Sequence, residues 1–524
     1  MSRYAYYTYL SVEGADIFTV VCLPEREGKF PTIITRSPYV DTEQDLSEQE
    51  IVDSRTRANE WLLRAGYAVV AQHCRGRGKS GGFCIPYIHE REDGLFLQEW
   101  IREQDFYNGE LYLIGESYTA SVHFVTAPFA PDIKGAVLSV QDCERYNCNY
   151  RNGFFKMGLH GGWYFNMYKK KEGLKKAYSP DAYKMLPLSD LSLAVLGERA
   201  EDFDAILAHP DRSDPFWQTR FGGGEAHEAI RHAHIPILLV TGFYDIYTGG
   251  VFDMWKTLDD ETRALSALLV HPYEHSGAGN NQPLRFEGGM LTEYLGNYYK
   301  LEWLESIRAG GASPVPRGKV SYYRLFDGWQ CDDFAESATR ARISLGKGRV
   351  NYTYNPFAPA SFNGGLSANF GGNAWQDAPN SRYDIISILS EPFAEDTRIK
   401  GKISARLRVS SDCEDTCFYL RLSLEKEEGW YGLRDEITKI SNFVADYTPG
   451  DEVTLDFSFD EIALLIKKGE RVRVDISSSA FPWYVPHTNT RGLYSAARDA
   501  RIAHNTVILD GSYIELPVEE GDKA

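Results

Sequence analysis

One short stretch, residues 111–121, constrains the fold of this chain more than any other. Four apolar residues at 111–114 run directly into Gly115, and a serine follows at position 117. A short apolar run bounded by glycine is typical of a buried parallel strand, and residues 120–125 can continue as a helix. A strand, a sharp turn with serine and a helix form a nucleophile elbow, in which a strained turn lifts the hydroxyl above the sheet edge.

The elbow interpretation has a simpler alternative. Gly115 suits an elbow, because a side chain two positions before the serine would strike the neighbouring strand. Position 119 is threonine, however, so the simple G-x-S-x-G pattern fails. An ordinary strand-to-helix loop, in which Ser117 caps the helix, would explain the short motif equally well.

Composition indicates a folded protein of two or three domains. The chain has 524 residues, of which 43% are apolar and 25% are charged, and its net charge is −18. Such a length and composition are typical of globular domains that each bury a core. The negative charge argues against nucleic acid or an anionic membrane as partner. We expect a small-molecule partner and leave a homo-oligomer open.

Targeting and cofactor signals are weak. The N-terminus lacks a long apolar core, so we expect no signal peptide, and no apolar run approaches the length of a membrane span. The eight cysteines are irregularly spaced and complete no zinc pattern. We therefore expect free thiols in a cytoplasmic protein, with no metal and no other cofactor.

Strands and helices alternate at the start of the chain. Apolar runs predict strands at 15–24, 31–36 and 67–72, and apolar positions between 93 and 104 fall on one face of a helix. This alternation predicts an α/β sheet. The glycine-rich loop at 76–81 fits G-x-G-x-x-G, but it does not open a helix, and a phosphate loop would need glycine at His73. We interpret it as a tight loop beside the active-site edge.

The pattern changes between residues 143 and 233. Glycine-, aromatic- and lysine-rich segments from 153 to 176 alternate with short helical pieces, which predicts an inserted helical cap. Three histidines near 227–234 are better explained as the end of a helix than as metal ligands. Four aromatic residues in the cap, or just past the next strand, could line an acyl pocket or simply form core: Trp163, Phe216, Trp217 and Phe243.

An acid and a histidine follow two later strands. Asp245 comes after the strand that begins near 235, and His275 comes after the strand at 265–270. In α/β hydrolases the catalytic residues occur in the order serine, acid, histidine. We therefore predict that Ser117 is the nucleophile, that His275 is the base and that Asp245 orients it. His271 and Asp253 are the alternatives, although His271 directly abuts its strand.

Beyond Trp329, apolar residues recur at every second position of the sequence. Alternation over 403–409, 418–424 and 453–459, with turn signals between, predicts half-buried strands of a β-sandwich. The expected division is an α/β domain from residues 1–142 and 234–328, a cap at 143–233 and a sandwich at 329–524.

Ordered motifs along nearly the whole chain resemble one family, the serine hydrolases of the cocaine esterase and Xaa-Pro dipeptidyl-peptidase type. The resemblance implies an α/β-hydrolase domain, a helical cap and a C-terminal jelly roll. The motifs are Arg36-Ser-Pro-Tyr39, Arg75-Gly-Arg-Gly-Lys-Ser-Gly-Gly, Glu99-Trp-Ile, Asn108-Gly, Gly115-Glu-Ser-Tyr118, Gly242-Phe-Tyr-Asp245, Pro272-Tyr-Glu-His275, Ser390-Glu-Pro, Asp475-Ile-Ser-Ser-Ser and Leu516-Pro.

The resemblance also implies a chemistry. It assigns acyl transfer to Ser117 with His275 and Asp245, and an oxyanion hole to the Tyr118 N–H and the Tyr39 hydroxyl. Ala120 stands where the family usually has glycine. His271-Pro-Tyr and His73-Cys-Arg-Gly also depart from the family, so the pocket of a relative does not transfer.

Three functions remain in competition. We expect a serine hydrolase that cleaves a small acyl ester or amide through an acyl-enzyme. A second possibility is an Xaa-Pro dipeptidyl-peptidase, or a β-lactam or amino-acid-ester acylase, that recognises a free amine by a carboxylate in the cap. The third is a catalytically silent binding protein on the same scaffold. The sequence does not identify the substrate.

Overall fold

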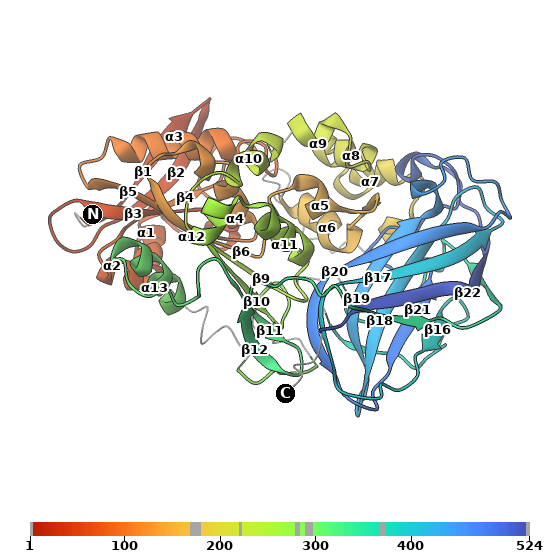
Figure 1. The fold of residues 1–524 in the computed structure, drawn as a ribbon. Helices are drawn as coiled ribbons and strands as arrows, with labels where there is room; N and C mark the ends of the chain where they lie inside the picture. The colour runs from red at the N-terminus through yellow and green to blue at the C-terminus, as the bar shows by residue number, and fades with distance from the viewer. Residues whose placement is uncertain are drawn as a thin grey trace.

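The fold combines a mixed sheet flanked by helices with a separate β-sandwich (Figure 1). The computed structural model describes residues 4–167, 180–219, 223–277, 283–288, 297–365 and 373–519. Within these ranges, no helix is both long and apolar enough to cross a bilayer.

The first sheet has ten strands in the order β1-β2-β4-β3-β5-β6-β9-β10-β11-β12. Neighbours from β4 to β11 are parallel, and the strands at both ends of the sheet are antiparallel. The strands are β1 (Ala5–Val12), β2 (Ala15–Cys22), β3 (Phe30–Ser37), β4 (Ala68–His73), β5 (Tyr107–Glu116), β6 (Ile133–Ser139), β9 (Ile237–Gly242), β10 (Ala267–His271), β11 (Val320–Arg324) and β12 (Gly328–Asp332).

Helices cover both faces of this sheet. On one face, α1 (Glu48–Ala58), α2 (Glu60–Arg64) and α13 (Asn297–Arg308) share a core with β3 and β4. On the other, α3 (Glu90–Arg102) and α4 (Tyr118–Phe124) pack on β5, and α11 (Thr248–Thr257) packs on β9. The central strands β4, β9 and β10 are consequently buried at every position, as expected of parallel strands.

The sheet is larger than the sequence predicts. Strands β1, β6 and β12 are additional, and β12 extends the sheet to Asp332, past the expected boundary at residue 328. The ring of Trp329 packs edge-on against Tyr323 at 5.5 Å, and its indole N–H donates to the carbonyl of Gly288. These contacts attach the start of the predicted sandwich segment to the first sheet.

The inserted segment lies between β6 and β9, beside both the α/β sheet and the sandwich (Figure 1). Cap residues share a buried cluster with Tyr118 on one side and Tyr494 on the other. The lysine-rich stretch at 169–176 is outside the described residues. The elements are α5 (Arg145–Asn149), β7 (Tyr150–Arg151), β8 (Phe154–Phe155), α6 (Met157–Met167), α7 (Leu191–Leu196), α8 (Glu201–Ala208), α9 (Pro215–Thr219) and α10 (Gly223–Ile230).

The C-terminal part is the predicted β-sandwich. One sheet contains β13 (Arg340–Ser344), β14 (Arg349–Tyr354), β17 (Thr397–Ser411), β20 (Val453–Ile466) and β22 (Ala503–Pro517). The other contains β15 (Trp375–Gln376), β16 (Ile386–Leu389), β18 (Cys417–Lys426), β19 (Gly429–Lys439) and β21 (Val472–Ser477). Leu407 of the first sheet and Leu420 of the second belong to one core.

The prediction that β18 is half-buried is wrong. Eight successive residues of this strand, from Cys417 to Leu424, are buried. The outward-facing Tyr419 packs against Phe362, with ring centroids 4.8 Å apart, and Arg421 donates to the carbonyl of Asn363. A long connecting segment therefore covers the second face of the strand, which alternation of residue types cannot indicate.

We predict that one arginine stabilises the junction between the cap and the sandwich. Arg151 donates to the carboxylates of Glu436 and Asp460, at 2.8 Å each. In Arg151→Met both acids lose their partner in a largely buried place, which should lower the free energy of unfolding by ~3 kcal/mol. The measurement is urea unfolding of the full chain.

The matched control is Arg406, which pairs with Asp456 by two hydrogen bonds on the exposed face of β17. Arg406→Met should cost less than ~1 kcal/mol, because surface pairs contribute little. Equal losses in the two variants would contradict the role assigned to Arg151.

Candidate active site

Ser117 occupies a strained turn between β5 and α4. Its φ and ψ are 55° and −130°, in a region that L-residues rarely adopt. Its N–H donates to the carbonyl of Ser139 at 2.9 Å, which ties the turn to β6. The serine lines a cavity of about 560 Å³, so its hydroxyl lies where a small molecule can reach it.

Gly115 is required for this turn, for a different reason from the one expected. A Cβ at this position would overlap the carbonyl of Thr119 and lie 2.6 Å from the backbone nitrogen of Ala120. The obstacle is the returning backbone of α4 rather than the neighbouring strand. Ala120 itself is fully buried in the core, so its methyl group is accommodated.

Asp245 and His275 lie together beyond the ends of β9 and β10. The imidazole Nδ1 of His275 is 2.8 Å from Asp245 Oδ1. The buried carboxylate also accepts hydrogen bonds from the Thr241 hydroxyl and the Tyr247 N–H. His275 lines the same cavity as Ser117, and Tyr247 packs edge-on against its ring at 5.6 Å.

The alternative base, His271, and the alternative acid, Asp253, lie away from the cavity that contains Ser117. His271 is buried, its Nδ1 accepts a hydrogen bond from the Tyr273 N–H, and burial lowers its pKa to about 3. It is therefore a neutral residue of the sheet edge. Asp253 lies on α11, 3.5 Å from Lys402 of the sandwich. Neither residue is among those that line the catalytic cavity in the described part of the chain.

Tyr39 reaches Ser117 from the loop after β3. Its hydroxyl lies near the side chains of Ser117 and Trp163, which both act on its pKa, and the indole N–H can only donate. Tyr39 lines the cavity and is 46% exposed, and desolvation by the surrounding protein raises its pKa. Arg77 of the glycine-rich loop donates to the carbonyl of Pro38 at 2.8 Å, which holds this loop in place.

Tyr118 contributes its backbone to the turn, while its side chain belongs to a buried network. The phenol donates to Glu90 Oε1 at 2.8 Å and accepts from the Tyr87 N–H at 2.7 Å. Glu90 pairs with the buried Arg36 at 3.1 Å. The rings of Tyr118 and Tyr87 stack at 4.2 Å, and burial raises the pKa of Tyr118.

Helix α6 and the residues after Asp245 complete the cavity wall. Among the wall residues of these segments, the sequence predicts only Trp163. The others were missed because the apolar positions of α6 do not reveal which side of the helix faces a cavity. The position of Ile246 and Tyr247 directly after Asp245 in the sequence could have indicated that they line the cavity. The residues not anticipated are Tyr87, Gly158, Leu159, His160, Gly162, Asn166, Tyr183, Ile246 and Tyr247.

Three predicted pocket residues lie elsewhere. Phe216 stacks on His209 at 4.4 Å, and the buried Trp217 donates its indole N–H to the carbonyl of His209. Phe243 is fully buried beside Phe252. These rings fill the cores of the cap and of the α/β part, so we leave them out of the substrate pocket.

Comparisons with known proteins agree with this architecture. The family model of the X-Pro dipeptidyl-peptidase (S15 family) matches residues 13–277, and that of the X-Pro dipeptidyl-peptidase C-terminal non-catalytic domain matches residues 332–515. The chain is 24% identical to the cocaine esterase of Rhodococcus sp. (strain MB1 Bresler) over 545 residues, which cover 92% of this chain and 91% of the relative.

Solved structures share the whole fold. An α-amino acid ester hydrolase superposes with a TM-score of 0.80 at 18% identity, covering 98% of this chain and 96% of the other. An aminopeptidase from the marine sediment archaeon Thaumarchaeota archaeon has a TM-score of 0.79 at the same identity and coverage. The predicted class, an α/β-hydrolase domain with a C-terminal β-sandwich, is confirmed.

The network around Tyr118 yields a prediction. Tyr118→Phe keeps the stacked ring but leaves the Tyr87 N–H and one Glu90 oxygen without their partner. Unpaired buried groups cost ~1–3 kcal/mol, and urea unfolding should show a loss of that size. Because the backbone N–H of residue 118 is unchanged, kcat of the folded variant should stay within about twofold of the parent. A large loss of kcat with unchanged stability would place the phenol itself in the reaction.

Proposed function

Because the chain belongs to the X-Pro dipeptidyl-peptidase (S15) family of serine hydrolases, we propose that it cleaves a small acyl ester or amide through an acyl-enzyme on Ser117. One observation carries this proposal. A single cavity of about 560 Å³ is lined by Ser117, His275 and Tyr39, and Asp245 hydrogen-bonds to the far side of the His275 ring.

In the proposed mechanism the Ser117 hydroxyl attacks the acyl carbon and His275 takes its proton. The carboxylate of Asp245 keeps the proton of His275 on Nδ1 and stabilises the imidazolium. The imidazolium then protonates the leaving group, and water attacks the acyl-enzyme with His275 again as base. Ser117 and His275 line the same cavity, and the serine hydroxyl would turn toward the imidazole as substrate binds.

The oxyanion hole is the second part of the proposal. The Tyr118 N–H and the Tyr39 hydroxyl would donate to the oxygen of the tetrahedral intermediate. Burial raises the pKa of Tyr39, which keeps its proton in place at neutral pH. The Trp163 side chain lies beside the same hydroxyl, and because its N–H can only donate, it leaves the phenolic proton available to the reacting carbonyl.

The cavity wall favours an uncharged substrate. Aromatic rings of Tyr39, Tyr87, Trp163 and Tyr247 surround the serine, and no Asp, Glu, Lys or Arg of the described ranges lines this cavity. A peptidase or acylase that binds a free amine would need a carboxylate there. We therefore favour esters with a neutral, aromatic acyl group over aminoacyl and Xaa-Pro substrates.

A substrate panel tests this choice. We expect p-nitrophenyl esters of neutral aromatic acids to show a higher kcat/KM than aminoacyl or Xaa-Pro p-nitroanilides. A preference for substrates with a free α-amine would instead support the peptidase or acylase function. Labelling of Ser117 by a fluorophosphonate separates either enzyme from a silent binding protein, because only an activated serine reacts.

The assignment of the base predicts different effects for two histidines. Ser117→Ala and His275→Ala should each lower kcat by at least ~10³-fold with little change in melting temperature. His271→Asn, which retains an acceptor for the Tyr273 N–H, should keep most of the activity. Steady-state kinetics on the best p-nitrophenyl ester provides the measurement, and an inactive His271 variant beside an active His275 variant would move the base to His271.

Tyr39 is predicted to act mainly in the transition state. Tyr39→Phe removes one oxyanion donor, which typically costs ~10²–10³-fold in kcat, while KM should change little. Folding should be nearly unaffected, since the ring remains and faces an open cavity. A loss of kcat below about twofold, in a variant with normal melting, would exclude Tyr39 from the oxyanion hole.

We also propose a cytoplasmic location. All eight cysteines fall within the described ranges, all are free thiols, and seven of them are buried. Unpaired cysteines in this number suit a reducing compartment. Cell fractionation of the native host, with detection of the protein by antibody, tests the location.

A further inference from the structure

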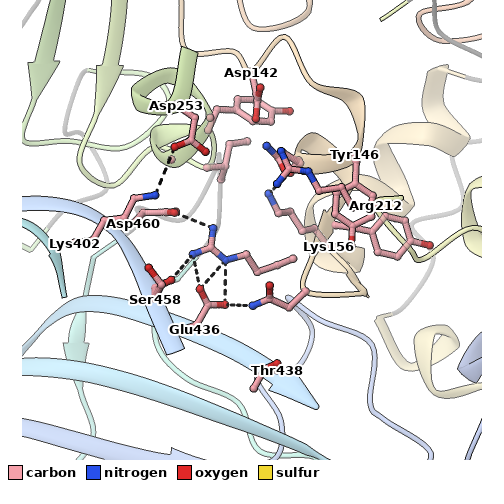
Figure 2. A pocket seen from close by; sticks show the side chains of 18 of the residues that line it. Asp142, Tyr146, Lys156, Arg212, Asp253, Lys402, Glu436, Thr438, Ser458 and Asp460 are labelled. Carbon is pink, nitrogen blue, oxygen red and sulfur yellow. Dashed lines mark hydrogen bonds and ion pairs between the residues drawn. The ribbon is translucent and has the colours of Figure 1, made fainter. Parts of the chain in front are cut away.

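A second cavity, of about 470 Å³, lies where the cap meets the sandwich (Figure 2). Its walls come from the segment 142–156, the start of α11, and strands β17, β19 and β20. It shares Ile246 and Tyr247 with the catalytic cavity, but Ser117 and His275 do not line it. We call this second cavity the interdomain cleft.

Most basic groups in the interdomain cleft have acidic partners. Arg151 is bound by Glu436 and Asp460, as described above. Lys402 lies 3.5 Å from Asp253 and 3.6 Å from Glu461. Arg212 is held by Glu144 through Nε and Nη2, at 2.8 and 2.6 Å. This leaves Nη1 of Arg212 without a partner among the described residues.

Lys156 differs from Arg151, Lys402 and Arg212 in its lack of an acidic partner among the described residues. It is only 6% exposed, and its ammonium group donates to the carbonyl of Asn147 at 2.6 Å. Asp142 and Asp460 influence it electrostatically, but no carboxylate of the described residues lies within the 4 Å of an ion pair. A buried ammonium without a counter-ion is costly, and burial accordingly lowers the pKa of Lys156.

Lys156 and the Nη1 side of Arg212, which has no partner among the described residues, line the same cleft. In Figure 2 the Lys156 amine and the Arg212 guanidinium both lie at the cap side of the interdomain cleft. An anion in the cleft would neutralise Lys156 and accept a hydrogen bond from the remaining Nη1 of Arg212.

We propose that the interdomain cleft is a binding site for a small carboxylate, held by Lys156 and Arg212. The opposite side carries Asp253 and Asp460 (Figure 2). These acids disfavour an anion with two charges, such as phosphate, whereas a carboxylate brings one charge and a planar pair of oxygens. The volume is within the range of small-molecule sites, and Ile246 and Phe443 provide apolar surface for the rest of the ligand.

Ligand-observed fluorine NMR tests the proposal on the full chain without any turnover, so the result is independent of the acyl-enzyme chemistry. The probe is 4-fluorobenzoate. Its neutral analogue 4-fluorobenzamide and its cationic analogue 4-fluorobenzylamine serve as controls. We expect the carboxylate to bind at least tenfold more tightly than either analogue. Binding of all three with similar Kd, or tightest binding of the amine, would overturn the proposal. Displacement of 4-fluorobenzoate by lower concentrations of inorganic phosphate than of benzoate would also overturn it.

Variants locate the bound probe. Lys156→Met should raise the Kd of 4-fluorobenzoate at least tenfold, and Arg212→Gln should raise it about fivefold. Lys402→Met, which removes a partnered cation from the same cleft, should change it less than twofold. Arg212 is largely exposed, so its variant provides the test if Lys156→Met does not fold. Unchanged Kd in Arg212→Gln, or loss of binding in Trp163→Ala but not in the cleft variants, would refute the site.

Discussion

The close approach of two backbone segments, at Gly115 and at Thr119 and Ala120, sets the geometry on which the active site depends. Only a residue without a Cβ lets α4 return over the end of β5 at this distance. The same turn forces Ser117 into a strained conformation. The strain is offset by packing on both sides, since β5 lies in the middle of the ten-stranded sheet and α4 is buried along most of its length.

Around this turn, neighbouring tyrosines serve two different purposes. The side chain of Tyr118 is bound to Glu90 and so to Arg36, which connects α4 to α3 and β3. The hydroxyl of Tyr39 instead lies near Ser117 and Trp163, and no buried ion pair of the described residues holds it. The chain thus buries one phenol to hold the backbone of the turn and leaves another at the wall of the cavity. This difference explains why loss of the hydroxyl should lower the stability of the fold in Tyr118→Phe but lower kcat in Tyr39→Phe.

The features predictable from sequence are those that depend on local pattern and chain order. Strand ends in parallel sheets meet at one edge, so chain order alone predicts that Ser117, Asp245 and His275 lie close together. Residues whose place depends on packing between distant segments could not be predicted in this way. Trp163 and Trp217 are both cap tryptophans, yet only the first faces the cavity. The burial of β18 and the pairing of Arg151 likewise depend on segments far away in sequence.

The distribution of charge separates the two cavities. In the described part of the chain, the catalytic cavity has aromatic and uncharged walls, whereas the interdomain cleft gathers basic and acidic side chains from three parts of the fold. Tyr247 lies between them, lining both cavities and packing against His275. If no charged group lines the first cavity, the hydrogen bonds of the proposed oxyanion hole would act in a medium of lower polarity, where such donors are most effective. The second cavity, with a buried ammonium that has no counter-ion among the described residues, is suited to binding an anion rather than to chemistry.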